Sequence, residues 1–395
     1  MKKNYILTGL IALGLSIAAT SCDDDSNDTN ELSEEEAQNI DYTAENSAAW
    51  GNYAVNVAML LSQDSQALYD AWNESFATAF KGHTASSGYS SANACVQQIV
   101  EGCIDIANEV GTAKIGEPYD YWTSGKTRQA VYAVESWYSW HSRDDYKNNI
   151  LSIANSLAGM RLEGNPRNFD FSHIVNNPDI APSVIAACMQ NDATRATSIR
   201  VWKDLCDAWE AIDGIPQPFR NNIGSEETEQ AMTACAYLVQ SLSELNSHIG
   251  KHISESECQA IAEQFVDEVA MPTYAELVAK NSVLLSAVQQ LQSHPSNNAF
   301  DSACAAWLAA RQPWETSEAF LFGPVSELGL DPNMDSWPLD AIGIANLLKS
   351  QTWADMKWSG EYDDESEAIE AAQSLRGFHT LEFLLFKNGK PRTVK

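Results

Sequence analysis

The sequence predicts an all-α protein made of two packed antiparallel helical bundles, and three observations lead to this prediction. Apolar residues make up 44% of the 395 residues, which is enough for a globular chain with sizeable cores. Over most of the chain, apolar side chains recur every three or four residues, the period of a helix with one buried face. No comparable stretch alternates apolar and polar residues as a half-buried strand does. Each apolar stripe has to be buried against another, so bundles with surface connections are expected.

The chain begins with a targeting segment. Lysines at positions 2 and 3 precede an apolar run over residues 5–19 that is too short to span a membrane comfortably. Small residues then lead to Cys22, an arrangement that resembles a bacterial lipobox, in which the cysteine becomes the lipidated first residue. We therefore expect residues 1–21 to be a lipoprotein signal peptide and Cys22 to carry the lipid. Ordinary signal cleavage beside an incidental cysteine is the alternative.

An acidic and mostly polar segment follows the cysteine. Residues 22–44 include three consecutive aspartates, Asp23 to Asp25, and this composition predicts a flexible tether. The expected location is the cell envelope, with the lipid in the outer membrane and the protein either periplasmic or surface-exposed. The formal net charge of −30 argues against a basic face, so no nucleic-acid partner is expected. The same charge is compatible with the capture of cations.

Five long helices can be placed from their apolar stripes. They are predicted over residues 96–110, 146–160, 199–212, 231–249 and 274–291. Gly111 is expected to end the first of these helices, and Ser225 is expected to cap the start of the fourth. Two domains are predicted, one helical bundle over residues 45–255 and a second over residues 256–395.

Three segments near the end of the chain resemble conserved blocks of a known family. Residues 377–382 have the sequence GFHTLE, which matches the GxHxxE signature of the imelysin-like family. Residues 314–324, which contain SEAFLFGP, and residues 337–340, WPLD, resemble two further blocks in the same order. In the usual family order GxHxxE lies in the first half, whereas here residues 135–139 resemble the later half. The resemblance therefore implies an imelysin-like fold in a circularly permuted order, which termini close together on a surface would allow.

Within the signature, His379 and Glu382 are the candidate functional residues. On a helix they lie one turn apart on the same face, and an imidazole beside a carboxylate suits a divalent transition metal or general acid–base chemistry. Gly377 has no side chain, so another backbone or a ligand can approach it closely. Glu318 is expected to add a carboxylate from a neighbouring helix. The predicted metal ligands are therefore His379, Glu382 and Glu318.

Further residues complete the predicted site. Asp340 is expected to supply a third carboxylate from a loop, and Arg311 or Arg376 to neutralise these acids if no metal is present. Glu135 and Ser139 are expected to line the same cleft from the first half of the chain. The alternative is structural, namely a buried network of histidine, glutamate and arginine side chains that holds helices together.

The resemblance to the imelysin-like family implies two different kinds of function. The family takes its name from an insulin-cleaving peptidase, and relatives are associated with bacterial iron uptake. A zinc peptidase usually carries HExxH, whereas His379 and Glu382 have no second histidine one turn further on, too few ligands for catalytic zinc. We therefore predict no catalytic residues and a non-catalytic envelope lipoprotein that binds iron, haem or an iron-uptake partner protein, with iron or another divalent metal as its cofactor. A metallopeptidase and a purely structural or interaction lipoprotein are the alternatives.

Overall fold

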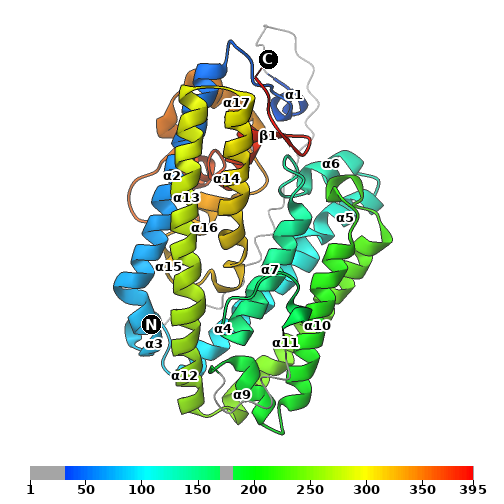
Figure 1. Ribbon diagram of the computed structural model, residues 1–395, viewed down its shortest axis with the longest axis vertical. Coiled ribbons are helices and arrows are strands. Elements are labelled where there is room, and N and C mark those ends of the chain that lie inside the picture. The colour runs from blue at the N-terminus through cyan, green and yellow to red at the C-terminus, as the bar shows by residue number, and fades with distance from the viewer. Residues whose placement is uncertain (1–31, 170–180, 395) are drawn as a thin grey trace.

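The computed structural model describes residues 32–169 and 181–394, and over these residues the chain is largely helical, with one short hairpin (Figure 1). This confirms the predicted all-α fold class. The hairpin pairs β1 (Phe386–Lys387) with β2 (Lys390–Pro391) in antiparallel register. The predicted signal peptide and Cys22 lie outside the described residues. None of the described helices has the length and apolar character needed to cross a membrane.

One bundle combines the start of the chain with its last third. Its helices are α2 (Ser47–Ala71), α13 (Met271–Ser293), α14 (Asn297–Glu315), α16 (Leu330–Asp335) and α19 (Gly377–Leu385). α2 packs along α13, α13 packs along α14, and α19 lies against α2, α14 and α16. The predicted division near residue 255 stays a prediction. α2 precedes this boundary in the sequence but packs on helices that follow it.

A second bundle is formed by the middle of the chain. Its helices are α4 (Ala92–Glu109), α7 (Ser142–Ala158), α9 (Val184–Gln190), α10 (Arg195–Gly214) and α11 (Glu226–His252). α10 packs on α7, α9 and α11, and α4 packs on α7 and α11. α7 also contacts α14 of the first bundle, and a single hydrophobic core extends over residues of both bundles.

The remaining elements are mostly short and join the two bundles or lie at their ends. The other α-helices are α1 (Glu34–Gln38), α3 (Ala77–Lys81), α5 (Gly116–Thr123), α6 (Thr127–Ala133), α12 (Glu255–Phe265), α15 (Pro324–Glu327), α17 (Ala341–Ser350) and α18 (Glu367–Gln373). The part of the chain that the structure describes also contains π-helical turns, namely η1 (Trp72–Phe76), η3 (Val110–Lys114) and η6 (Val266–Ala270). Its 3-10 turns are η2 (Ala85–Ser87), η4 (Pro166–Asn168), η5 (Phe219–Asn221), η7 (Glu318–Phe320) and η8 (Trp353–Met356). α1 lies within the predicted tether, where it packs against α17.

All five predicted helices are present, and one predicted helix end is wrong. Ser225 caps α11, since its side chain accepts a hydrogen bond from the backbone N–H of Thr228. Gly111, in contrast, does not end α4, because the chain continues into the π turn η3. A Cβ atom on Gly111 would lie 2.8 Å from the Cβ of Cys235 in α11. This glycine therefore allows η3 to pack closely on α11 rather than ending a helix.

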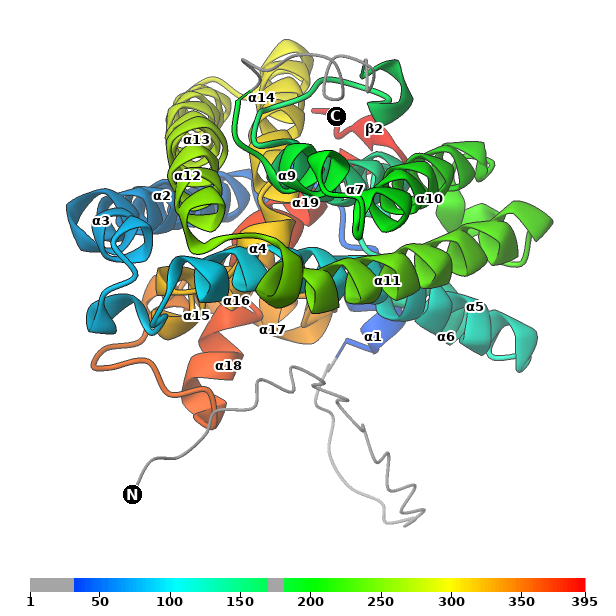
Figure 2. The same ribbon diagram turned by 90° about the horizontal axis from the view of Figure 1, so that it is seen from below.

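α19 lies at the centre of the molecule, between α13 on one side and α7 and α10 on the other (Figure 2). All nine of its residues are buried. Its last carbonyl groups are bonded by side chains from other elements: Trp50 Nε1 donates to Leu384 O at 2.8 Å, and Arg392 Nε donates to Phe383 O at 2.9 Å. A buried helix end needs such partners. The helix that carries the GxHxxE signature is therefore held firmly at the junction of the two bundles.

Candidate functional site

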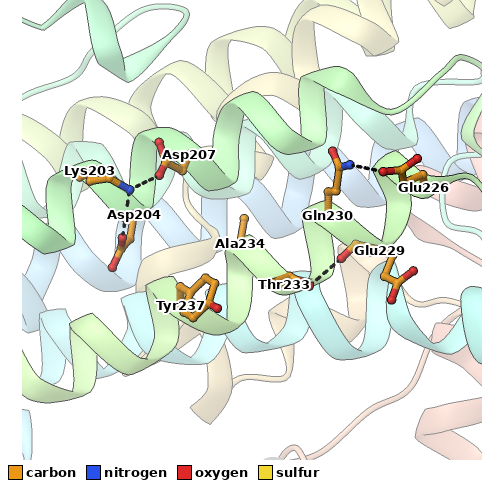
Figure 3. A pocket seen from close by; sticks show the side chains of 9 residues that line it. All are labelled: Lys203, Asp204, Asp207, Glu226, Glu229, Gln230, Thr233, Ala234 and Tyr237. Carbon is orange, nitrogen blue, oxygen red and sulfur yellow. Dashed lines mark hydrogen bonds and ion pairs between the residues drawn. The ribbon is translucent and has the colours of Figure 1, made fainter.

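An open pocket of about 500 Å³ lies on the surface between α10 and α11 (Figure 3). Several of its polar side chains contact one another: Lys203 Nζ lies 2.5 Å from Asp207 Oδ2, and Gln230 Nε2 donates to Glu226 Oε1 at 3.1 Å. None of the residues predicted for function lines this pocket. The predicted functional residues lie instead in the interior, where the two bundles meet.

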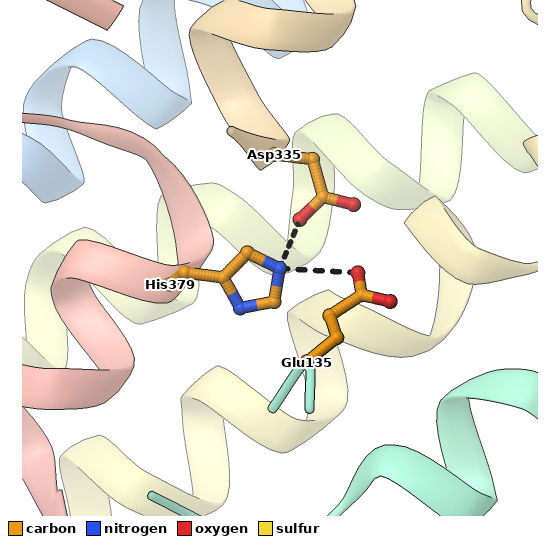
Figure 4. A group of neighbouring side chains, drawn as sticks. All are labelled: Glu135, Asp335 and His379. Carbon is orange, nitrogen blue, oxygen red and sulfur yellow. Dashed lines mark hydrogen bonds and ion pairs between the residues drawn. The ribbon is translucent and has the colours of Figure 1, made fainter. Parts of the chain in front are cut away.

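His379 is the centre of that interior group. Its Nε2 lies 3.1 Å from Glu135 Oε1 and 3.1 Å from Asp335 Oδ1, so both carboxylates approach one ring nitrogen (Figure 4). Its Nδ1 lies 3.3 Å from Glu382 Oε2. The other oxygen of Glu382 accepts a hydrogen bond from the backbone N–H of Ser139 at 2.7 Å. The imidazole is fully enclosed, and its orientation is fixed from both sides.

Arg311, one per cent exposed, lies beside the histidine and contacts four carboxylates. The contacts join Nη2 to Glu135 Oε1 at 3.0 Å, Nη2 to Glu315 Oε1 at 2.6 Å, Nε to Asp145 Oδ2 at 3.4 Å, and Nη1 to Asp335. Nη2 also lies 3.4 Å from His379 Nε2. A guanidinium group is suited to this position because its planar fork of donors can bond several carboxylates at once.

Lys114 supplies the second permanent positive charge. Its Nζ lies 3.1 Å from Glu135 Oε2, and its side chain is only 8% exposed. Lys114 is the last residue of the π turn η3, and such turns often occur at functional sites because they re-aim the residues around them. The π turn that replaces the predicted helix end at Gly111 thus brings a lysine into the group.

The pKa shifts describe which of these groups are charged. Burial lowers the pKa of His379 and so does Arg311, but Asp335 and Glu135 outweigh both and raise it well above its ordinary value. Burial raises the pKa of Glu135, but Lys114 and the hydrogen bond from His379 overcome this effect and lower it to about 2. Burial also raises the pKa of Asp335, yet Arg311 and His379 lower it below its ordinary value. His379 is therefore an imidazolium between two ionised carboxylates at neutral pH.

A second set of carboxyl groups lies next to Asp335. One oxygen of Asp335 lies within 4.8 Å of oxygens from Glu315 and Glu318. Burial raises the pKa of Glu315 well above its ordinary value in spite of Arg311, and burial does the same for Glu318 in spite of Lys114. These two carboxyl groups therefore hold their protons to a higher pH than ordinary glutamates do, as expected for acids that share too few cations.

Acidic side chains outnumber basic side chains in the enclosed group. Among the described residues, five carboxyl groups with side chains at most 7% exposed are in contact with it, against two permanent cations and one imidazolium. The five are Glu135, Asp145, Glu315, Asp335 and Glu382. An excess of acids in an enclosed site favours either retained protons or an additional cation.

The structure places the sequence-predicted residues in two classes. Six of them lie in or against the interior group: His379, Glu382, Glu318, Arg311, Glu135 and Ser139. Gly377 has a φ of +91°, and a Cβ there would lie 2.5 Å from the carbonyl oxygen of Met334, so the missing side chain lets α16 bring Asp335 to the histidine. Asp340 is exposed and caps α17, where it accepts from the N–H of Gly343 at 2.8 Å, so it belongs to a helix start and not to the site.

Arg376 also lies outside the group. It pairs with Asp64 of α2 and donates to the carbonyl oxygen of Met356 at 3.2 Å, so it attaches the start of α19 to its neighbours. Sequence reasoning missed four residues of the group: Lys114, Asp145, Glu315 and Asp335. Glu315 could have been found, because it lies four residues after Arg311 on the same helix face. The other three have no local signal, since they arrive from separate elements.

The donor types of the group fit one divalent cation. His379 Nε2 and one oxygen each from Glu135 and Asp335 lie within 4.8 Å of one another, and two ionised carboxylates with an imidazole are common ligands of iron and zinc. Glu382 faces the other ring nitrogen, so in this geometry it orients the histidine instead of sharing the ion with it. The predicted ligand set was His379, Glu382 and Glu318. In the structure Glu382 lies at Nδ1 of the histidine, whereas Glu135 and Asp335 lie at Nε2, so an ion bound at Nε2 would not contact Glu382.

Comparisons with known proteins agree with the sequence resemblance. A family model described as imelysin (Peptidase_M75) matches residues 23–249 and 270–394. The crystal structure of an imelysin peptidase from Bacteroides ovatus is 48% identical, with a TM-score of 0.84, and the match covers 91% of this chain and 100% of that one. Iron-regulated protein A from Synechococcus elongatus is 33% identical over 128 residues, a match that spans 32% of this chain and 31% of that relative.

Proposed function

Because the chain belongs to the imelysin family, we propose that it is a non-catalytic binding component of iron or haem uptake at the cell envelope, with the enclosed group around His379 as its binding site. The similarity to an iron-regulated protein supports an association with iron. The match spans less than a third of that relative, so the ligand has to be argued from the residues of this chain.

The observation that carries the proposal is the excess of acidic groups over cations. Five enclosed carboxyl groups share two permanent cations and one imidazolium among the described residues, and two of the five, Glu135 and Asp335, are ionised beside His379. A divalent ion at this position would replace the proton of His379 Nε2 and reduce the excess of negative charge. His379, Glu135 and Asp335 would hold the ion, and Glu382 would orient the imidazole.

A non-catalytic role is favoured over a peptidase by the ligands and by their enclosure. Among the described residues, the potential ligand groups contain a single histidine, whereas catalytic zinc in peptidases usually has two and keeps one position open to water. The side chains of His379 and Glu382 are fully buried. A peptide bond could reach them only after a large rearrangement. A metal ion bound here would offset the negative charges of Glu135 and Asp335.

The location and the order of the chain are part of the same proposal. The lipid anchor at Cys22 would keep the protein at the outer membrane, on its periplasmic or outer face. The circular permutation stays a prediction. A purely structural lipoprotein is the competing possibility, since Arg311 and the imidazolium of His379 already pair with Glu135 and Asp335 and could simply join the two bundles.

Metal binding separates these possibilities. The purified protein would be stripped with a chelator and titrated with Fe²⁺ under anaerobic conditions, with Zn²⁺ as a second ion, and the bound metal would be measured by mass spectrometry. We expect one ion per chain, and we expect His379→Ala and Asp335→Asn to weaken binding by about 100-fold or more. Binding should strengthen as pH rises, because a proton competes for Nε2 of His379.

The matched control is His294→Ala, which removes an exposed histidine at the end of α13 and should leave binding unchanged. A haem absorption spectrum that depends on His379 would support the proposal with haem as the ligand. Stoichiometric metal or haem binding that survives His379→Ala, or no binding of either by a folded protein, would overturn it in favour of a structural network.

A further inference from the structure

A second pocket, of about 550 Å³, lies at the C-terminal hairpin and is lined by basic residues. Lys387, Lys390 and Arg392 all contribute to it, together with a single acid, Asp41. The chain has only 24 lysines and arginines against 54 acids, so three cations at one pocket are a local exception to its acidic surface. The pocket is separate from the group around His379, and its volume is within the range of small-molecule sites.

The hairpin places two of these cations side by side. Lys387 and Lys390 are direct partners in the pairing of β1 with β2, so their side chains project from the same face. Like charges directly opposite one another destabilise a strand pair. Among the described residues Lys390 has no ion pair and is exposed, so nothing in this part of the chain offsets its charge. An anion bound between the two lysines would offset the charge of Lys390.

A carboxylate of the chain itself already binds to two of the cations in this pocket. Asp41 Oδ1 lies 2.5 Å from Lys387 Nζ and 3.6 Å from Arg392 Nη1. Arg392 is held in place, since its side chain is 3% exposed and donates to the carbonyl oxygens of Phe383 and Ile40. A fixed guanidinium beside flexible lysines is a common arrangement for binding carboxylate or phosphate.

An aromatic side chain also lines the pocket. Trp140 contributes its indole ring, and a Cβ atom on Gly389 of the hairpin turn would lie 2.3 Å from that ring, so the turn packs directly on it. The N–H of Gly389 donates to the carbonyl oxygen of Tyr138 at 2.9 Å. The indole N–H of Trp140 is enclosed and has no acceptor among the described residues.

We propose that this pocket is an anion-binding site for a carboxylate- or phosphate-bearing molecule, held by Lys390, Lys387 and Arg392 beside the ring of Trp140. The free molecule and the headgroup of an anionic lipid present the same chemistry to these residues. The proposal is independent of metal binding at His379, because none of the pocket residues belongs to that group.

Two substitutions with opposite expected effects test it. Lys390→Glu should weaken anion binding by roughly fivefold or more, the size expected for the loss of one exposed ion pair, while forming a favourable pair with Lys387 that keeps the hairpin folded. Asp41→Asn removes the competing carboxylate from Lys387 and should tighten binding by a similar factor. The control is Lys251→Glu, an equal charge change on α11, whose end leads into α12 at the opposite end of the molecule from β1 (Figure 1).

The full chain would be titrated calorimetrically with citrate and with inorganic phosphate at low ionic strength, and mixed with vesicles of phosphatidylglycerol or of neutral phosphatidylcholine. Binding of a free anion that changes in both predicted directions supports the proposal with a soluble ligand. Binding only to phosphatidylglycerol vesicles, with the same order of variants, supports it with a lipid headgroup. Absence of binding to every probe, or binding that is equal in Lys390→Glu, Asp41→Asn and the control, would overturn it.

Discussion

Replacing Arg311 with methionine should lower the free energy of unfolding by about 3–5 kcal/mol, the cost of removing one partner from a buried ion pair. The guanidinium contacts four enclosed carboxylates, and methionine fills a similar volume without a charge or a donor. Each carboxylate keeps at least one other partner: Lys114 and His379 for Glu135, His379 for Asp335, Asn149 for Glu315 and Ser136 for Asp145. The expected loss in the free energy of unfolding is therefore that of one buried ion-pair partner, and not the sum of four separate ion pairs.

The dependence of this loss on pH identifies its cause. In the wild type, Arg311 lowers the pKa of Asp335, Glu315 and Asp145 relative to what burial alone would give. Without it, the folded-state pKa of each of these carboxyl groups rises: Asp335 loses the lowering by Arg311, and the pKa values of Glu315 and Asp145 move further above their unfolded values. A raised folded-state pKa stabilises the fold at low pH, and this contribution is lost as pH rises through that pKa. The difference between the variant and the wild type should therefore be smallest near pH 5 and grow toward pH 8.

Urea unfolding followed by circular dichroism at several pH values would measure both effects. The control is Arg200→Met, because Arg200 pairs with Glu244 on the surface and both side chains are more than 40% exposed. Such a surface pair contributes little, so the control should lose less than about 1 kcal/mol. A loss below about 1 kcal/mol for Arg311→Met, or a larger loss that does not change with pH, would refute the view that Arg311 is the cation that balances this group.

Four further predictions follow from other residues. The wild type should be most stable between about pH 5 and 6.5. The lowered pKa of Glu135 gives stability that is lost as pH falls from the unfolded-state pKa of this group toward about 2. The raised pKa of His379 gives stability that is lost as pH rises through the folded-state pKa of the histidine. Gly377→Ala should cost about 1–3 kcal/mol in thermal unfolding, more than Gly164→Ala, where φ is also positive but the surrounding space is open. Cys22→Ala should move the protein from the membrane fraction to the soluble fraction, and a variant that stays with the membrane would contradict the lipid anchor. Finally, the purified protein should not digest unfolded protein substrates, and chelator-sensitive cleavage that disappears in His379→Ala would show that it is a peptidase.

The sequence by itself determined the helices and the centre of the site. The apolar stripes predicted all five long helices, because a helix that buries one face repeats its apolar residues locally, within a few turns. The GxHxxE segment identified the family and indicated that His379 and Glu382 share a helix face. Glu135 and Ser139 were predicted to lie beside them through the resemblance of a second short segment, and the structure brings all four together.

Only the tertiary structure decided how the site is built. Glu135 and His379 are 244 positions apart in sequence, so their contact depends on how the two bundles pack and not on any local pattern. Lys114 reaches the group because η3 is a π turn where a helix end was predicted, and Asp335 reaches it because Gly377 leaves room for α16. Asp340, an equally plausible acid in sequence, caps a helix at the surface. A charged residue has the same local signature whether it is solvated or enclosed, and enclosure arises only when distant elements exclude water together.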